Sequence, residues 1–188
     1  MWTVILRVLE KVVAHFVDVK TIIIFRLEGE PNRAITPKVP VEVKRLTRDD
    51  MPLISDLYGV KVGSRKEQTF HRRFKDGADC FGAFHRGQLV SVGWGIFGED
   101  VDTSTGFTLK AAADQVISSD GLTSEAFRGM RIRPYMIIST IDFYRQRGLT
   151  MITAVEQSNT SSLRNICRIG FKEVHRQHLV KIFGIRVK

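Results

Sequence analysis

The chain has 188 residues, of which 43% are hydrophobic and 26% are charged, a size and composition that allow one globular domain with a substantial core. These values exclude a disordered or low-complexity chain, and two lone cysteines, Cys80 and Cys167, exclude a disulfide-rich scaffold. The formal net charge of +9 favours an anionic partner. Because the sequence carries no secretory signal, we expect a cytoplasmic protein.

The first 40 residues are expected to form an N-terminal extension and a linker ahead of the main domain. Apolar residues recur at three- and four-residue steps between Trp2 and Phe16, which predicts an amphipathic helix. This helix can pack on the main domain or on a second copy of the chain in a homodimer, or lie on a membrane surface. The β-branched residues 21–25 predict a short buried strand, and three prolines in residues 29–40 indicate the linker. No apolar run reaches the roughly 20 residues of a membrane-spanning helix.

The main domain is expected to span residues 41–188 and to begin with strands and helices in alternation. Residues 41–46 alternate as in a strand, and Thr47 and Ser64 are suited to cap two following helices. Strands over residues 80–85 and 89–97 are joined by Arg86 and Gly87, a pair typical of a hairpin turn. Another strand is predicted over residues 114–123.

The second half of the domain predicts strand–helix–strand units. We expect a helix over residues 132–147, a strand over 150–156, and a helix from Asn159 or Thr160 to Ile169. Two closing strands are expected over residues 171–174 and 179–185. The whole pattern predicts an α/β (mixed) fold, in which a central mixed β-sheet, parallel in its second half, carries helices on both faces.

Residues 124–134 lie between a predicted strand and a predicted helix, and they are rich in arginine. A strand that turns into a helix N-terminus presents unpaired backbone N–H groups and the positive end of the helix dipole, which together can bind a pyrophosphate. Arg128, Arg131 and Arg133 add positive charge there. The chain from residue 125 onward has 12 Lys or Arg against 4 Asp or Glu, whereas the first 124 residues have 17 against 16. The alternative is a basic loop without a ligand.

A second segment of interest begins at Asn159, at the end of a predicted strand. An asparagine there can form a hydrogen bond with an amide or carbonyl group of a ligand. Gly170 suits a helix C-terminus that needs a positive φ, and Phe171 then enters the core. The alternative is a helix cap followed by an ordinary helix end.

Together the two segments resemble the GNAT superfamily of acyl-CoA-dependent N-acyltransferases, over residues 41–188. In that family a strand leads through an Arg/Gln-x-x-Gly-x-Gly/Ala turn into a helix, and Asn-x-x-Ala follows the next strand. Arg128 matches the first position of the turn, and Asn159 and Ser162 match the later motif. Arg131 and Arg133 stand where the family usually has small residues, so either the turn is reshaped or these arginines contact phosphate. A left-handed backbone at Arg131 would cost about 1 kcal/mol.

The resemblance implies that acetyl-CoA is the cosubstrate and that its acetyl group passes directly to a primary amine of a small molecule, such as an amino sugar or a nucleotide sugar. Asp120 is the first candidate for the catalytic base, and Glu156 is the second. The residues implied in acetyl-CoA binding are Leu122, Thr123, Arg128, Gly129, Met130, Arg131, Ile132, Arg133, Asn159 and Ser162.

Other functions stay open on the sequence alone. The chain could be a non-catalytic GNAT-like protein or a basic binding module for an anionic partner. Nucleic acid is disfavoured, because the arginines cluster at one helix start without interleaved aromatic residues. We expect no metal site, because His175 and His178 are spaced so that a strand would place them on opposite faces.

Overall fold

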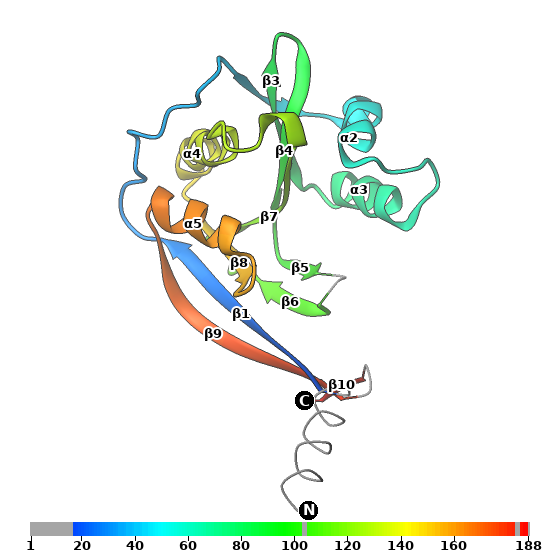
Figure 1. Ribbon diagram of the computed structural model, residues 1–188, viewed down its shortest axis with the longest axis vertical. Helices are drawn as coiled ribbons and strands as arrows, with labels where there is room; N and C mark the ends of the chain where they lie inside the picture. Colours follow the sequence, from blue (N-terminus) through cyan, green and yellow to red (C-terminus); the bar gives the residue numbers. More distant parts are fainter. Residues whose placement is uncertain (1–16, 103–104, 183–184, 188) are drawn as a thin grey trace, which may run out of the picture.

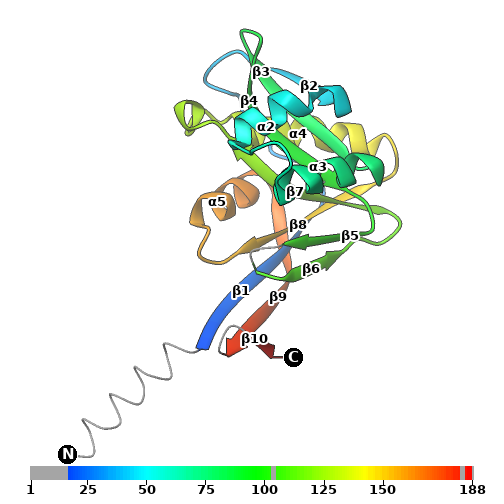
Figure 2. The same cartoon turned by 90° about the vertical axis from the view of Figure 1, so that its right-hand side faces the viewer.

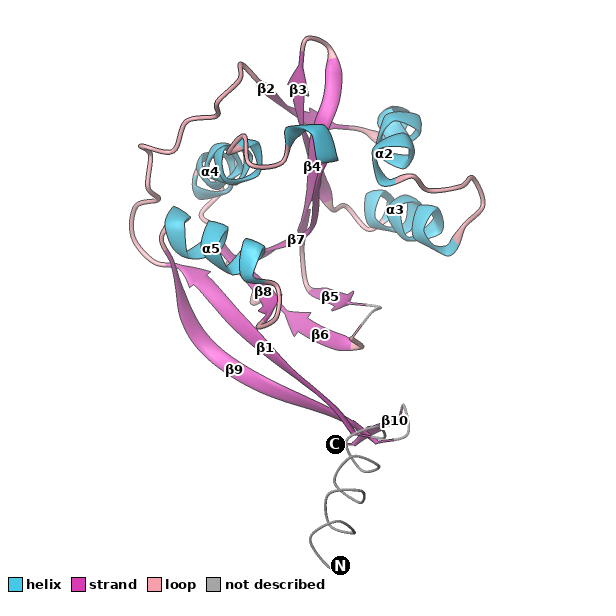
Figure 3. Ribbon diagram, in the orientation of Figure 1, coloured by secondary structure: helices cyan, strands magenta, loops and turns pink. Residues whose placement is uncertain are grey.

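The computed structural model describes residues 17–102, 105–182 and 185–187 of the chain. The helix predicted over residues 2–16 lies outside these ranges. The described strands form one eight-stranded sheet in the order β10-β9-β1-β8-β7-β4-β3-β2, and a separate two-stranded sheet, β5-β6 (Figures 1 and 3). The strands are β1 (Val17–Leu27), β2 (Glu42–Leu46), β3 (Asp79–His85), β4 (Gln88–Ile96), β5 (Glu99–Asp102), β6 (Phe107–Lys110), β7 (Gln115–Thr123), β8 (Thr150–Glu156), β9 (Phe171–Ile182) and β10 (Ile185–Val187).

Helices cover both faces of the large sheet, as the sequence predicts. Helices α2 (Met51–Tyr58) and α3 (Arg65–Lys75) lie on one face, and α4 (Ile132–Arg145) and α5 (Thr160–Ile169) lie on the other (Figures 1 and 2). Short 3-10 turns, Arg48–Asp50 and Glu125–Phe127, precede α2 and α4. The fold is therefore a mixed α/β sandwich of helix, sheet and helix layers.

The pairing in the second half of the sheet differs from the predicted parallel arrangement. Within the described residues the parallel pair is β7 with β8, and β1 separates β8 from β9, antiparallel to both. A parallel strand–helix–strand unit across α5 would need β8 and β9 to be neighbours. The N-terminal strand takes that place instead, which the local sequence pattern does not reveal.

The strand of the predicted extension is thus an inner strand of the central sheet. It is longer than the expected residues 21–25, and Ile22, Ile23 and Phe25 have 3%, 5% and 4% of their surface exposed. Apolar side chains on both faces of a strand are typical of the interior of a sheet covered on both sides. The sheet therefore does not begin at residue 41, although the prolines do mark a long connection from β1 to β2.

Two further details differ from the sequence prediction. The closing strands expected over residues 171–174 and 179–185 form one continuous strand, β9, because β1 offers it a partner from Val17 to Leu27. The β5-β6 hairpin, which covers part of the sheet beside α3, was not predicted (Figure 2). Its strands are four residues each, too short to show a clear periodicity.

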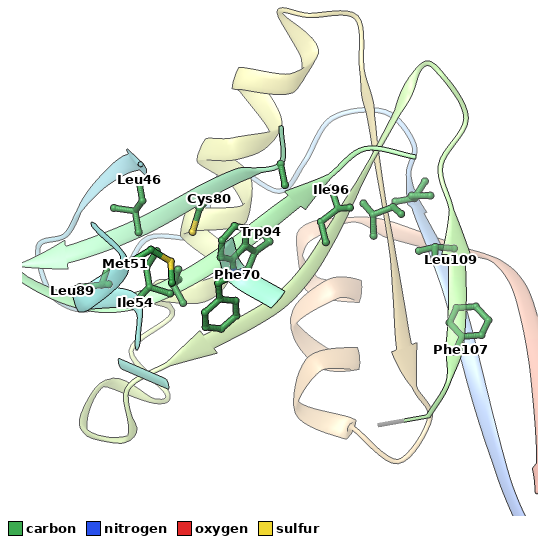
Figure 4. Close-up of a cluster of buried hydrophobic side chains, with 14 of the residues drawn as sticks. Leu46, Met51, Ile54, Phe70, Cys80, Leu89, Trp94, Ile96, Phe107 and Leu109 are labelled. Atoms are coloured by element: carbon green, nitrogen blue, oxygen red, sulfur yellow. The ribbon is translucent and has the colours of Figure 1, made fainter. Parts of the chain in front are cut away.

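Two main clusters of buried side chains, one on each face of the sheet, join the layers. On the α2–α3 face, Phe70 stacks on Trp94 with ring centroids 5.4 Å apart, and Ile54 is fully buried beside them (Figure 4). On the α4–α5 face, Ile141 and Ile169 pack with the inward side chains of β1 and β8. The large apolar residues spaced along each helix thus hold the central strands, and the functional site with them, between two rigid layers.

Candidate functional site

A cleft opens in the middle of the sheet where β7 and β8 separate. Gln115, Val116 and Ile117 pair with Thr150, Met151 and Ile152, and beyond these residues the two strands diverge. The cavity there has a volume of about 510 Å³, within the usual range for small-molecule sites. We call it the β7–β8 cleft. Its walls include residues 118–121 of β7, residues 153–156 of β8, parts of α3, α4 and α5, and the β5-β6 hairpin.

The β7 wall of the cleft contains a bulge. The register between β4 and β7 shifts between Val92 and Trp94, and opposite this shift Asp120 has a φ of +46°. A left-handed backbone at a non-glycine residue costs about 1 kcal/mol and is found where the surroundings hold it. Here the hydroxyl of Tyr58, on α2, donates to the backbone oxygen of Asp120. Burial, and then the Asp120 carboxylate, raise the pKa of Tyr58 well above its ordinary value, so the phenol remains a donor.

The backbone of Arg133 is in the first turn of α4, but its guanidinium lies against the residues of this bulge. Its Nη1 donates to the backbone oxygen of Val92 at 3.1 Å. A Cβ added to Gly93 would lie 1.9 Å from Nη1, and one added to Gly121 would lie 2.1 Å from Cζ, so the two glycines provide the space for the guanidinium. The expectation that this side chain contacts phosphate at the turn is therefore corrected: its guanidinium is turned inward, onto β4 and β7, and it lines the β7–β8 cleft.

The sequence analysis did not predict a network of charged side chains on the α3 side of the cleft. Lys66 and Arg73 both donate to Oδ2 of Asp120, at 2.6 and 2.8 Å, and Arg73 also pairs with Asp100 at 3.2 Å. Ser119 donates to the other oxygen of Asp100 at 2.5 Å. Lys66 and Arg73 are seven residues apart on one helix, so they lie on the same face of it. This spacing is the signal in the sequence that could have indicated the network.

This network affects the first candidate for the catalytic base. Two cations already donate to one oxygen of Asp120, which leaves that oxygen poorly placed to accept a proton from an amine. The second candidate, Glu156, also lines the cleft, at the end of β8. Its Oε2 lies 3.4 Å from Nζ of Lys20, and its Oε1 accepts a hydrogen bond from Ser158 at 2.8 Å. Lys20 comes from β1, so the N-terminal strand contributes to the site.

Two residues of the turn before α4 have a left-handed backbone. Gly129 and Arg131 have φ values of +74° and +59°, and Arg131 is the N-cap of α4. Arg128 is exposed and pairs with Glu125 at 3.0 Å, Arg131 is exposed, and Ile132 is buried. The backbone oxygen of Met130 accepts a hydrogen bond from the backbone N–H of Lys38 at 2.9 Å, which attaches the linker to the turn. Arg131 thus adopts the left-handed backbone whose cost the sequence analysis considered, at a position where the family usually has a small residue.

Leu122 and Thr123 connect the bulge to this turn. They pair with Val92 and Ser91 of β4, and Ser91 Oγ donates to the backbone oxygen of Leu122 at 2.9 Å. Both follow the cleft-lining residues 118–121 directly. The β7 residues that line the cleft therefore precede Leu122 and Thr123, the two β7 residues that the sequence implied in acetyl-CoA binding.

Asn159 is both a helix cap and a cleft residue. Its Oδ1 accepts a hydrogen bond from the backbone N–H of Ser162 at 3.1 Å, and both residues line the β7–β8 cleft. The two readings of Asn159 from the sequence are compatible, because the cap uses the amide oxygen and not the amide nitrogen.

Five of the residues proposed from sequence therefore meet at the cleft, and the others lie on β7 or at the turn beside it. Those in the cleft are Asp120, Arg133, Glu156, Asn159 and Ser162. In the described parts of the chain, no three His, Cys, Asp or Glu side chains gather as metal ligands would. Nor is any helix there long and apolar enough to pass through a membrane.

Comparison with known proteins identifies the fold. No family model and no curated protein sequence matches the chain. Among solved structures, a GNAT-family acetyltransferase from Colwellia psychrerythraea matches with a TM-score of 0.65 at 14% identity, over 88% of this chain and 57% of that one. One from Novosphingobium aromaticivorans matches with a TM-score of 0.63 at 15% identity, over 87% and 64%. AAC(6')-Iy matches with a TM-score of 0.57 at 13% identity, over 73% and 95%.

The chain thus has the fold of the GNAT acetyltransferases, as the resemblance in its sequence implies. It spans about three fifths of the length of the first two of these proteins. At identities of 14% and 15% the likeness concerns the fold, and the activity has to be argued from the site.

Proposed function

We propose that the chain transfers an acetyl group from acetyl-CoA directly to a primary amine of a small molecule, such as an amino sugar or a nucleotide sugar. The observation that carries this proposal is the separation of β7 and β8, which opens a cavity of about 510 Å³ inside the sheet. Strands that separate leave backbone N–H and C=O groups unpaired on their facing edges. The amide groups of the pantetheine arm can pair with these groups along β7.

The 128–133 turn is suited to the pyrophosphate of the same cosubstrate. It follows the 3-10 turn Glu125–Phe127 after β7 and leads to the N-terminus of α4, a helix of 14 residues whose first N–H groups and dipole favour an anion. Arg128 and Arg131 are exposed at this turn. We propose that the backbone of residues 129–133, these two side chains, and Leu122, Thr123, Asn159 and Ser162 contact acetyl-CoA.

The acidic side chains that line the cleft are suited to a cationic acceptor. Asp100, Asp102, Asp120 and Glu156 line the cavity, and carboxylates attract an ammonium group. AAC(6')-Iy was solved with the bisubstrate analogue CoA-S-monomethyl-acetylneamine, which supports a CoA donor and an amine acceptor in this fold.

The reaction requires a neutral amine, and Glu156 is the proposed proton acceptor, because its cation, Lys20, lies 3.4 Å away, whereas two cations hold Asp120 at 2.6 and 2.8 Å. The amine nitrogen forms a bond to the thioester carbon as its proton moves to Glu156. The carbon–sulfur bond breaks, its electron pair leaves with sulfur, and the thiolate then takes up a proton. Asp120 holds Lys66 and Arg73 at the cleft through its ion pairs.

Calorimetric titration with acetyl-CoA tests the donor, and release of free thiol with a panel of amino sugars and nucleotide sugars tests the transfer. A ligand at about 100 times its dissociation constant stabilises the fold by about 2.7 kcal/mol, so the melting temperature should rise as well. No binding at millimolar acetyl-CoA would overturn the proposal. Binding without thiol release for any amine would instead favour a non-catalytic protein with a GNAT-like fold.

A further inference from the structure

Arg133 is a cleft-lining cation that has no carboxylate partner in the described residues. Its one hydrogen bond there is from Nη1 to the backbone oxygen of Val92. Lys66 and Arg73 line the same cleft, and each of them pairs with Asp120. The guanidinium of Arg133 thus has N–H groups left over at the place where β7 bulges.

The fold makes room for this unpaired charge at some cost. Gly93 and Gly121 would each clash with the guanidinium if they carried a side chain, and Asp120 adopts a strained backbone beside it. Burial lowers the pKa of the Arg133 guanidinium, and Tyr58 and the Asp120 carboxylate offset only part of this shift. A buried cation that no carboxylate hydrogen-bonds adds little stability, and such departures from local rules are expected at functional sites.

We propose that Arg133 is a catalytic residue, whose guanidinium donates a hydrogen bond to the carbonyl oxygen of the acyl donor in the β7–β8 cleft. The assignment rests on the proposed function. When the amine nitrogen bonds to the carbonyl carbon, one electron pair of the C=O bond moves to oxygen. Arg133 stabilises that negative charge without giving up its proton. The pair then returns to re-form the C=O bond as the carbon–sulfur bond breaks.

The position of Arg133 fits this role better than a role at the pyrophosphate. β7 passes the bulge at Asp120 and Gly121 and ends at Thr123, and the 3-10 turn Glu125–Phe127 then leads to the turn that begins at Arg128. Acetyl-CoA with its pyrophosphate on the turn and its pantetheine arm along β7 therefore brings its thioester to the bulge, where the guanidinium of Arg133 lies. A fixed cation in a site partly shielded from water stabilises developing charge with little reorganisation.

Isotope-edited infrared spectroscopy of bound acetyl-CoA, labelled with ¹³C at the carbonyl, tests the contact without an acceptor. A hydrogen bond to the carbonyl oxygen lowers the C=O stretching frequency relative to free acetyl-CoA. We expect this shift in the wild-type protein and its loss in Arg133→Met. Calorimetry on the same samples should give dissociation constants within about threefold of each other, because the guanidinium is directed at one oxygen of a large ligand.

Gly121→Ala provides a second route to the same change. An added Cβ would lie 2.1 Å from the guanidinium carbon, so the arginine must move, while the backbone of Gly121 has no positive φ that would exclude alanine. This variant should also lose the infrared shift, and in the Arg133→Met background it should have no further effect. Arg176→Met is the matched control, since this exposed arginine pairs with Glu173 on β9. Its spectrum should equal that of the wild type.

With an amine acceptor, Arg133→Met and Gly121→Ala should each lower kcat by about 10²–10³-fold, the usual effect of removing an oxyanion donor. An unchanged carbonyl frequency in Arg133→Met would overturn the assignment and leave the proposed function intact. The assignment would also be overturned by a fall in acetyl-CoA affinity that accounts for the whole loss of activity. It would be overturned as well if the variants lost activity only with acyl donors that carry a carboxylate. Absence of acetyl-CoA binding to the wild-type chain would overturn the proposed function, and the role of Arg133 with it.

Discussion

Arg73 of α3 and Asp120 of β7 are joined by a hydrogen bond of 2.8 Å between Nη1 and Oδ2. The pair connects a helix on one face of the sheet to the bulge that shapes the β7–β8 cleft. Arg73 is only 11% exposed, and its guanidinium also lies 5.3 Å from the ring centroid of Trp94. One side chain therefore links the acidic wall of the cleft to the aromatic core beneath α3.

Arg73→Gln should lower the free energy of unfolding by about 2–3 kcal/mol, measured by urea denaturation. The substitution leaves Asp100 and Asp120 without this cation, and both carboxylates are largely buried, at 15% and 24% exposure. Arg176→Gln removes an exposed ion pair and should change stability by less than about 0.5 kcal/mol. Equal losses in the two variants would show that the Arg73 network contributes nothing beyond a surface pair.

Two tyrosines should make the fold unstable in alkali. Burial is the main cause that raises the pKa of Tyr58 and Tyr144, with Asp120 and Asp79 as the respective second causes. In the unfolded chain these phenols ionise near pH 10, so above about pH 10 the unfolded state has fewer bound protons than the folded state, and stability falls. Below that pH their contribution is complete.

Absorbance of phenolate and circular dichroism, followed together from pH 9 to 12.5, test this expectation. The signal from Tyr58 and Tyr144 should appear together with unfolding, and the Tyr58→Phe/Tyr144→Phe variant should show a shallower loss of stability above pH 10. Ionisation of either phenol in a chain that is still folded would contradict the burial argument.

Asn159→Ala should lower stability by about 1 kcal/mol, because Oδ1 caps α5 through the N–H of Ser162. Ser64→Ala removes the corresponding cap of α3, where Ser64 accepts from Glu67 at 3.3 Å, and should cost a similar amount. On the proposed function, the two variants differ in acetyl-CoA affinity, which should fall for Asn159→Ala alone. Asn159→Asp keeps the cap and should still bind acetyl-CoA more weakly. Equal affinity in all these proteins would leave Asn159 as a helix cap only.

Arg131→Gly should raise the free energy of unfolding by up to about 1 kcal/mol, because glycine adopts a φ of +59° without strain. Arg131→Ala retains the strain and should not stabilise the fold. If the guanidinium contacts the pyrophosphate, both variants should bind acetyl-CoA more weakly, and the wild-type affinity should decrease with added salt. A stabilised Arg131→Gly with full affinity would confine the anion site to the backbone.

Much of the main domain follows from local patterns in the sequence. Ser64 caps α3 as predicted, Arg86 and Gly87 turn the hairpin with φ values of +49° and +81°, and Gly170 ends α5 with a φ of +114°. These features depend on neighbours within a few residues, for which backbone propensity and side-chain capping are sufficient. The strand–turn–helix around Arg128 and the segment after Asn159 are local in the same sense, which is why they could indicate the fold.

Only the tertiary structure decided where β1 inserts, which way Arg133 points and which acids remain available in the cleft. The partners of β1 are more than 120 residues away, at Ile152 to Glu156 and Phe171 to Ile182, and no periodicity within residues 17–27 selects them. Arg133 turns inward because Gly93 and Gly121 leave space there, and the ion pairs of Asp120 come from α3, 47 and 54 residues earlier. The sequence determined most of the elements and the family of folds, but not the β5-β6 hairpin or the continuity of β9. The site depends on packing between distant segments, because vacant space and ion pairing exist only once those segments meet.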